Sequence, residues 1–203
     1  MKILFIGGTG NISLACAELL IERGHDLTLL NRGTRSTVDF PCDVIIADRN
    51  KPGELKKALE GKYFDVIADF ICFDRAGAEL AYEACKDTCG QYIMISTTVV
   101  YEKPAKKLPI TEDTPYGNDF WPYGRLKEEA EKYLLEKHRD NNFPLTIVRP
   151  SHTYSKTWIP NMVSSNDYTI AARLEKGLPI FVPDDGQGMW TLTHVRDFAV
   201  GFA

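Results

Sequence analysis

The opening stretch MKILFIGGTGNIS constrains the fold more than any other part of this sequence. An apolar run from Ile3 to Ile6 leads into a turn with three glycines in four residues, and a segment of helical periodicity follows. A short continuous apolar run is typical of a strand buried on both faces, and the glycines that bound it indicate a tight turn. The stretch therefore predicts a buried strand that turns directly into a helix.

Strand-like and helix-like segments alternate along the rest of the chain. The expected strands are residues 2–6, 26–30, 43–47, 66–70, 92–96 and 145–148, and the expected helices are residues 12–23, 52–59, 76–88, 122–139 and 168–176. The composition, 44% hydrophobic and 26% charged, suits a packed core. Together these features predict an α/β fold: a doubly wound parallel Rossmann sheet with helices on both faces.

The pattern weakens after residue 150. Residues 151–167 look irregular, residues 178–193 have room for two short strands, and the chain stops at residues 194–203 in what looks like the first turns of a helix. We therefore expect a small and truncated C-terminal region in a chain that is a fragment. Residues 102–120 are polar and rich in Pro and Gly, which predicts a long functional loop.

Composition also narrows the classes of partner. The net charge is −4 and no cluster of Lys or Arg stands out, so no nucleic-acid partner is expected. No apolar run is long enough to cross a bilayer, so no membrane partner is expected either. The histidines are dispersed and show no metal-ligand spacing, which predicts no metal site.

Cysteine usage indicates the compartment. The five cysteines are scattered without a C-x-x-C pair, namely Cys16, Cys42, Cys72, Cys85 and Cys89. This odd, dispersed set fits reduced thiols in a cytoplasm better than a disulfide framework. Cys85 and Cys89 are four residues apart on an expected helix, and two packed thiols are favoured over a redox pair.

The glycine turn has a specific chemical use at the start of a βαβ unit. Gly7 permits the tight turn, Gly10 lets phosphates approach the backbone, and the third position packs the helix close to the sheet. Ser13 occupies that third position here, and it is still small. The free N–H groups of the helix N-terminus favour an anion. The turn predicts a dinucleotide site formed by Gly7, Thr9, Gly10, Asn11 and Ile12, with a purely structural turn as the alternative.

The chain is expected to have two parts. We expect a dinucleotide-binding Rossmann domain over residues 1–150, followed over residues 151–203 by a partial substrate-binding region interleaved with the last strands.

The end of the second expected strand bears on the choice of cofactor. A carboxylate there would bind the ribose hydroxyls of NAD, but this chain has Asn31 and Arg32, with Arg35 nearby. An arginine at this point can meet a 2′-phosphate, which favours NADP over NAD, although Arg32 could also be a solvated loop charge. Asp48 ends the third strand, where it could contact the adenine amino group or simply stabilise a turn.

The motif Tyr-x-x-x-Lys occurs three times, so position must decide between the copies. They are Tyr82/Lys86, Tyr123/Lys127 and Tyr133/Lys137. Residues four apart share a helix face, and ligands of an open α/β sheet lie at the carboxyl ends of its strands. Only Tyr123/Lys127 lies at the start of a helix that follows the fifth strand. That strand ends in the hydroxyl cluster 96–98, so Thr97 joins the pair.

A threonine, a tyrosine and a lysine together suit hydride transfer. A tyrosine pKa near 10 must fall by roughly three units, about 4 kcal/mol, for the phenol to act as a base at neutral pH. The Lys127 ammonium and an oxidised nicotinamide could supply that shift. Thr97 would hold the substrate oxygen, and Tyr123 would take its proton as hydride leaves, or return the proton in the reverse direction.

These motifs together resemble the extended short-chain dehydrogenase/reductases, which include the NAD-dependent epimerases and dehydratases. The resemblance runs from residue 1 to about residue 203 and rests on GGTGNIS, STTVVY at 96–101, YGRLK at 123–127, VRP at 148–150 and HVRD at 194–197. It implies Thr97, Tyr123 and Lys127 as the catalytic triad, with Lys127 also holding the nicotinamide ribose. It further implies that Pro150 and Ser151 lie beside the nicotinamide, and that helices 76–88 and 122–139 build a homodimer.

The sequence departs from the family pattern at the substrate side. Nucleotide-sugar epimerases carry an arginine four residues before the His-Val motif, where this chain has Trp190. Asp69-Phe70 and the stretch 190–194 look more like an atypical branch that includes chloroplast stem-loop RNA-binding proteins. His152, Tyr154, Trp158, Trp190 and His194 could line a substrate pocket or simply pack.

Two functions follow from this sequence. The first is an NAD(P)-dependent oxidoreductase or epimerase, cytoplasmic, that acts on a small hydroxylated, sugar-like compound by hydride transfer with Tyr123 as acid or base. The alternative is a non-catalytic dinucleotide-sensing or RNA-binding protein on the same scaffold.

Overall fold

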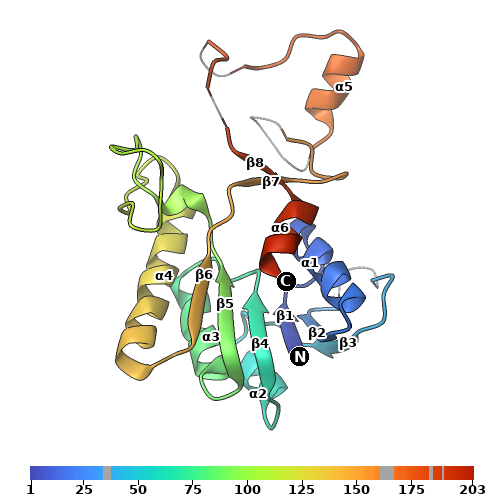
Figure 1. The fold of residues 1–203 in the computed structure, drawn as a ribbon, viewed down its shortest axis with the longest axis vertical. Coiled ribbons are helices and arrows are strands. Elements are labelled where there is room, and N and C mark those ends of the chain that lie inside the picture. Colours follow the sequence, from blue (N-terminus) through green and yellow to red (C-terminus); the bar gives the residue numbers. More distant parts are fainter. Residues whose placement is uncertain (34–37, 161–166, 183–184, 189) are drawn as a thin grey trace.

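The computed structural model describes residues 1–33, 38–160, 167–182, 185–188 and 190–203. Six parallel strands form its central sheet (Figure 1). They are β1 (Lys2–Ile6), β2 (Asp26–Asn31), β3 (Asp43–Ile46), β4 (Phe64–Asp69), β5 (Cys89–Ile95) and β6 (Leu145–Val148). The strand order is β3-β2-β1-β4-β5-β6. This order reverses between β1 and β4, where ligands of doubly wound sheets bind, and the predicted Rossmann fold is confirmed.

Helices cover both faces of this sheet (Figure 1). One face packs against α1 (Asn11–Glu22) and α6 (Val195–Phe202), and the other against α2 (Glu54–Leu59), α3 (Arg75–Cys85) and α4 (Pro122–Asn141). Successive strand residues point to opposite faces. Ile3 and Phe5 therefore join the core under α1, while Leu4 and Ile6 join the core under the other three helices.

Two predicted strands begin earlier in the structure. β4 begins at Phe64 rather than residue 66, and β5 begins at Cys89 rather than residue 92. Phe64 pairs with Cys89 in the parallel register, which extends both strands backwards. The added residues include the exposed Asp65 and Gly90, which separate the buried Phe64 and Cys89 from the apolar runs that follow them.

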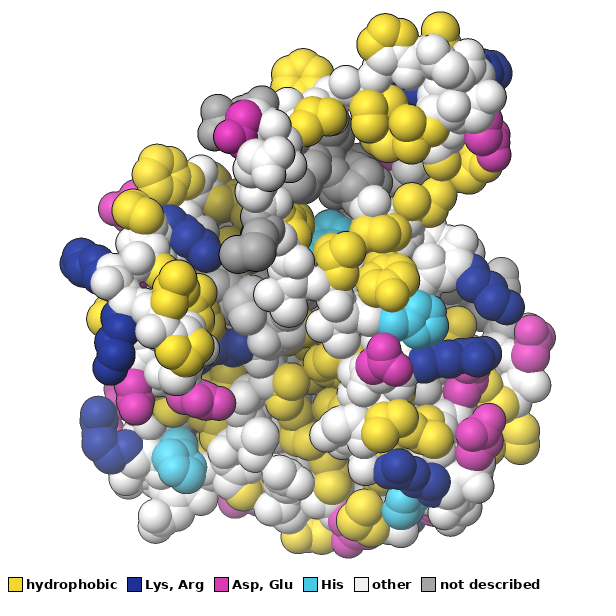
Figure 2. All heavy atoms as spheres, turned by 45° about the horizontal axis from the view of Figure 1, so that its top comes forward, with side chains coloured by type: hydrophobic (Ala, Val, Ile, Leu, Met, Phe, Trp, Pro, Cys, Tyr) yellow, Lys and Arg dark blue, Asp and Glu magenta, His cyan; other side chains and the backbone are white. Residues whose placement is uncertain are grey.

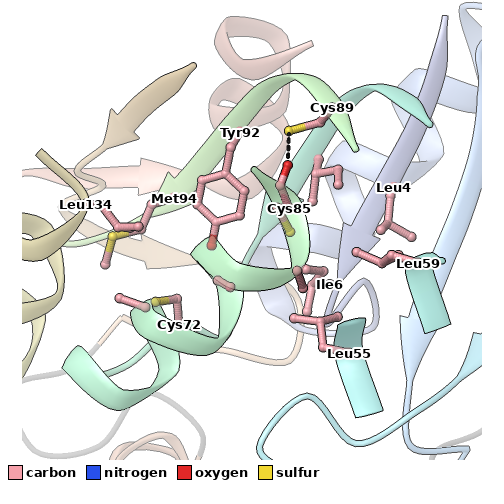
Figure 3. Packing of buried hydrophobic residues seen from close by; sticks show 14 of the residues in the cluster. Leu4, Ile6, Leu55, Leu59, Cys72, Cys85, Cys89, Tyr92, Met94 and Leu134 are labelled. Carbon is pink, nitrogen blue, oxygen red and sulfur yellow. Dashed lines mark hydrogen bonds between the residues drawn. The ribbon is translucent and has the colours of Figure 1, made fainter. Parts of the chain in front are cut away.

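Cysteines contribute thiols to the core between the sheet and α3. Figure 3 shows Cys72, Cys85 and Cys89 among apolar side chains, with the Cys89 thiol donating to the Cys85 carbonyl oxygen at 3.4 Å. All five cysteines are free. Burial raises the pKa of Cys72 and of Cys89 to about 12, which leaves these thiols protonated and unreactive at neutral pH. The predicted packed thiols are confirmed.

The region after residue 150 holds a second, two-stranded parallel sheet. β7 (His152–Tyr154) lies within the segment predicted as irregular, so that prediction is wrong there. Its partner β8 (Leu192–His194) is the only strand in the described part of residues 178–193, where two were expected. Both strands have three residues, too short for a sequence pattern. Between β7 and β8, α5 (Thr169–Glu175) buries no residue. Hydrophobic side chains of the part of the chain that joins β7 to β8 gather on the surface (Figure 2).

No helix in the described part of the chain is long and apolar enough to span a membrane. Likewise, the described residues contain no group of three His, Cys, Asp or Glu side chains that could hold a metal ion.

Candidate functional site

The glycine turn follows β1 at the point where the strand order reverses. Gly7 has a φ of +84°, and a Cβ there would lie 2.7 Å from the Ile71 side chain. A Cβ on Gly8 would lie 2.4 Å from Leu29. The protein's own packing therefore requires these two glycines, which supports the structural explanation for both.

Gly10 is different, because nothing in the protein crowds it. A Cβ there would meet only the Ser13 hydroxyl, at 3.4 Å, and the backbone is extended (φ −89°, ψ 178°). Space for a Cβ is thus left open beside the first turn of α1. A backbone that is bare toward open space at a helix N-terminus is what a phosphate group requires.

Ser13 does more than pack the helix. Its side chain is 1% exposed, accepts from the Gly10 N–H at 2.8 Å and donates to the Gly7 carbonyl oxygen at 3.0 Å. The serine therefore fixes the turn that the missing third glycine would only accommodate. These bonds leave the first N–H groups of α1, those of Asn11 and Ile12, at the open end of the helix.

Asn11 supplies the clearest sign of a polar ligand. Both the nitrogen and the oxygen of its side-chain amide are buried without a hydrogen-bond partner among the described residues. A buried amide with no partner is costly, so a group that bonds to it would stabilise the site. Thr9 lies half-buried in the same turn. The residues present thus fit a dinucleotide pyrophosphate.

The predicted ribose and adenine contacts lie at the ends of β2 and β3. Asn31 accepts from the Gly33 N–H at 2.8 Å, and Arg32 is exposed without a described carboxylate partner. Arg35 lies outside the described residues. The Asp48 carboxylate accepts from the Asn50 N–H at 3.1 Å, so it does stabilise a turn. A contact of Asp48 with adenine stays a prediction.

The ends of β5 and α4 are brought together by a small residue. A Cβ on Gly124, in the first turn of α4, would lie 2.9 Å from the Val99 carbonyl oxygen. Val99 belongs to the short 3-10 helix η1 (Thr98–Val100), which follows β5 directly. Because Gly124 allows this approach, Tyr123 and Lys127 come to lie beside the strand end that carries Thr97.

Lys127 is the most buried of the predicted catalytic residues, at 1% exposure. Its ammonium donates to the carbonyl oxygens of Cys72 and Ile95, each at 2.7 Å, and lies 5.9 Å from the centre of the Tyr123 ring. Burial lowers the pKa of Lys127. The lysine thus joins α4 to the end of β5 and to the segment that follows β4.

Tyr123 and Thr97 complete this corner of the sheet. The Thr97 hydroxyl accepts from the Val99 N–H at 3.2 Å, and the Pro150 carbonyl oxygen accepts from the Thr98 N–H at 3.0 Å. Burial raises the pKa of Tyr123, the opposite of the shift that a general base needs. The phenol of the free protein is therefore protonated at neutral pH, the form that a proton donor requires.

The two other Tyr-x-x-x-Lys pairs have structural partners. The rings of Tyr82 and Tyr133 meet edge to face at 6.3 Å between α3 and α4. Lys137 lies 5.0 Å from the Tyr133 ring, and Lys86 pairs with Glu83 at 3.2 Å. These pairs help to pack the two helices, and the catalytic role of Tyr123/Lys127 stays a prediction.

One buried ion pair beside the site escaped the sequence analysis. Glu131, fully buried one turn beyond Lys127, accepts three hydrogen bonds from Arg149, the shortest at 2.6 Å, and one from the Ser96 hydroxyl. Tyr116, in the long loop, donates to the same carboxylate at 2.7 Å. The sequence signal for this ion pair was a glutamate four residues after Lys127, on the face of the helix that is expected to lie against the core.

Aromatic residues of the C-terminal region pair across β7 and β8. His152 meets Trp190 edge to face at 5.3 Å, and Tyr154 meets His194 at 5.1 Å. His194 also caps α6 by accepting from the Arg196 N–H at 3.3 Å. The Nε2 atom of His152 is buried without a described partner, so it alone of this group has an unused polar atom inside the fold.

Known proteins are similar to this chain over nearly its whole length. A family model, the NAD dependent epimerase/dehydratase family, matches residues 3–203. A chloroplast stem-loop binding protein of 41 kDa from Arabidopsis thaliana is 29% identical over 99% of this chain and 54% of its own length. A 2′-dehydrokanamycin reductase from Streptomyces kanamyceticus is 22% identical over 100% of this chain and 57% of its own. This chain therefore spans little more than half the length of either relative.

Solved structures show the same fold. A UDP-glucose 4-epimerase from Bifidobacterium longum, solved in complex with NAD+ and UDP, superposes with a TM-score of 0.78 at 20% identity. The match covers 100% of this chain and 72% of that one.

Proposed function

We propose, from the premise that this chain belongs to the NAD-dependent epimerase/dehydratase family, that it binds a nicotinamide dinucleotide along the carboxyl ends of β1, β4 and β5. The single observation that carries this proposal is the turn after β1. Gly10 leaves open space at the N-terminus of α1, and the Asn11 amide is buried beside it without a described partner.

Each residue has a separate role in the proposed reaction, an NAD(P)-dependent oxidation or reduction of a small hydroxylated, sugar-like compound. The dinucleotide supplies or accepts the hydride. Asn11 and Ile12 bind its pyrophosphate through their backbone N–H groups and the Asn11 amide, in the space that Gly10 leaves open. Lys127, held by two carbonyl oxygens, keeps a proton that can bond the ribose.

Proton transfer falls to the first turn of α4. Thr97 positions the substrate oxygen, and the Tyr123 phenol gives it a proton in the reductive direction or takes one in the oxidative direction. The raised pKa of Tyr123 favours the protonated phenol, which is the form that the reductive direction requires.

The choice between the two cofactors is tested by titrating the protein with NADH and with NADPH while following tryptophan fluorescence. If Arg32 meets the 2′-phosphate, NADPH binds more tightly, and Arg32→Ala weakens NADPH binding about tenfold without changing NADH binding. If NADH and NADPH bind equally tightly, and Arg32→Ala changes neither affinity, Arg32 is a solvated surface charge. Absence of binding by both cofactors would overturn the proposed function.

A binding protein on the same scaffold is the second candidate, because one relative is named a stem-loop binding protein. The net charge of this chain, −4, counts against RNA as a ligand. A salt-sensitive shift of a stem-loop RNA by this protein would favour the second candidate.

A further inference from the structure

A buried arginine links two loops at the ligand edge of the sheet. Arg49 lies between β3 and α2 and is 2% exposed. Its guanidinium donates to the Asp69 carboxylate at 2.7 Å and to the carbonyl oxygens of Gly77 at 3.0 Å and Ile71 at 3.3 Å. One side chain thus bonds to the last residue of β4, to the segment between β4 and α3, and to the first turn of α3, and so holds that segment at both ends and at Ile71.

Asp69 completes the arrangement from the end of β4. It is fully buried, accepts from the Tyr92 hydroxyl at 2.9 Å and accepts from the Ile71 N–H at 2.9 Å. Figure 3 shows Tyr92 in the same cluster as Cys72, the next residue of the fastened segment. The carboxylate therefore holds Ile71 by its N–H while Arg49 holds it by its carbonyl oxygen.

The fastened segment contacts both halves of the proposed site. The Ile71 side chain occupies the space beside Gly7, where a Cβ would lie 2.7 Å away. The carbonyl oxygen of Cys72 accepts from the Lys127 ammonium at 2.7 Å. Two consecutive residues thus support the phosphate end and the catalytic lysine.

A contribution to stability does not by itself explain why a buried ion pair such as Arg49–Asp69 is present. A buried ion pair can often be replaced by apolar residues of similar volume without loss of stability, because desolvation offsets the attraction. The planar guanidinium, however, meets three acceptors at fixed angles, which neither an apolar side chain nor a lysine can do. The arrangement is therefore better suited to fixing a backbone conformation than to stabilising the fold.

We propose that Arg49 is a positioning residue, whose ion pair with Asp69 fixes the segment between β4 and α3 so that one loop sets both the Gly7 turn and the Lys127 ammonium. The inference on Lys127 stands without a bound cofactor. The inference on cofactor affinity rests on the proposed function.

The test compares three variants. Arg49→Lys keeps the positive charge but loses the planar guanidinium. The double variant Arg49→Met/Asp69→Leu removes both charges together. Leu59→Ala is the control, because Leu59 is fully buried in the same core cluster but belongs to α2 and makes none of these contacts. Mass spectrometry measures the acylation rate of the Lys127 amine relative to that of the exposed Lys62. The urea concentration is chosen for each protein so that all of them have the same free energy of unfolding during the reaction.

We expect both Arg49 variants to raise Lys127 acylation about fivefold, as loss of one net hydrogen bond predicts, and Leu59→Ala to leave it unchanged. Acylation that stays at the wild-type rate in the Arg49 variants, or that rises equally in Leu59→Ala, would overturn the proposal. If the double variant does not fold, Arg49→Lys decides by the same criterion.

Cofactor affinity provides the second readout. The Arg49 variants should bind the nicotinamide dinucleotide about tenfold more weakly than Leu59→Ala does. If the wild-type protein binds no dinucleotide, the proposed function fails, while the acylation rates still decide the role of Arg49.

Discussion

Replacing Arg149 with methionine is expected to lower the free energy of unfolding by about 3–5 kcal/mol. The substitution leaves the Glu131 carboxylate, which is fully buried, without its cation. It also removes the hydrogen bonds that Arg149 donates to the hydroxyls of Tyr101 at 2.9 Å and Tyr116 at 2.8 Å. Urea unfolding followed by circular dichroism measures the loss.

Two controls separate the buried pair from a general loss of side-chain contacts. The double variant Arg149→Met/Glu131→Leu should recover much of the lost stability, because no buried charge is left unpaired. Lys51→Ala breaks an exposed ion pair with Glu54 and should change stability by less than about 0.5 kcal/mol. An Arg149→Met variant as stable as Lys51→Ala would show that the Glu131 network does not hold α4 on the sheet.

Replacing Tyr123 with phenylalanine is expected to reduce turnover by a factor of about 10²–10⁴, the usual contribution of a positioned acid or base. The Tyr123 hydroxyl forms no hydrogen bond with another described residue, so its removal should change neither stability nor cofactor affinity appreciably. The assay follows reduced cofactor in the presence of a panel of sugars and their keto derivatives. Tyr133→Phe is the matched control, because its motif is the same but its ring packs between α3 and α4. Equal turnover by Tyr123→Phe and Tyr133→Phe would remove Tyr123 from the chemistry.

The pH profile of the same reaction gives a second criterion. A phenol donates a proton only below its pKa and accepts one only above it. Because burial raises the pKa of Tyr123, kcat/KM for reduction should stay flat above neutral pH until the Lys127 ammonium, whose pKa burial lowers, loses its proton. In the same range, kcat/KM for oxidation should rise about tenfold per pH unit.

Local sequence patterns were sufficient to predict most of the sheet, and they also pointed to one candidate site. The six expected strands all occur, because each carries an apolar run that a parallel sheet covered on both faces requires. The glycine turn and Tyr123/Lys127 were placed by the rule that ligands meet the carboxyl ends of such strands. The structure then distinguishes the three glycines. Packing requires Gly7 and Gly8 to be glycine, but it does not require this of Gly10.

Long-range polar contacts could not be predicted in this way. Arg49 and Asp69 are 20 residues apart, and Glu131 and Arg149 are 18 apart, so no helical or strand period connects them. The direction of the Tyr123 pKa shift was equally hidden, since burial of the ring depends on how α4 packs against η1. The short strands β7 and β8 depend on each other and have no core pattern of their own.

Titration of Gly10→Val with NADH and NADPH tests the central claim most directly. The Cβ of the valine meets only the Ser13 hydroxyl in the protein, so the fold should persist, while the added side chain occupies the space proposed for the pyrophosphate. Gly201→Val is the control, because a Cβ there meets no atom within 4 Å and Gly201 lies in α6, away from the turn after β1. We predict dinucleotide binding by the wild-type protein and by Gly201→Val, and a dissociation constant at least about 100-fold higher for Gly10→Val. Equal binding by all three proteins, or binding by none, would contradict a dinucleotide site at the turn after β1.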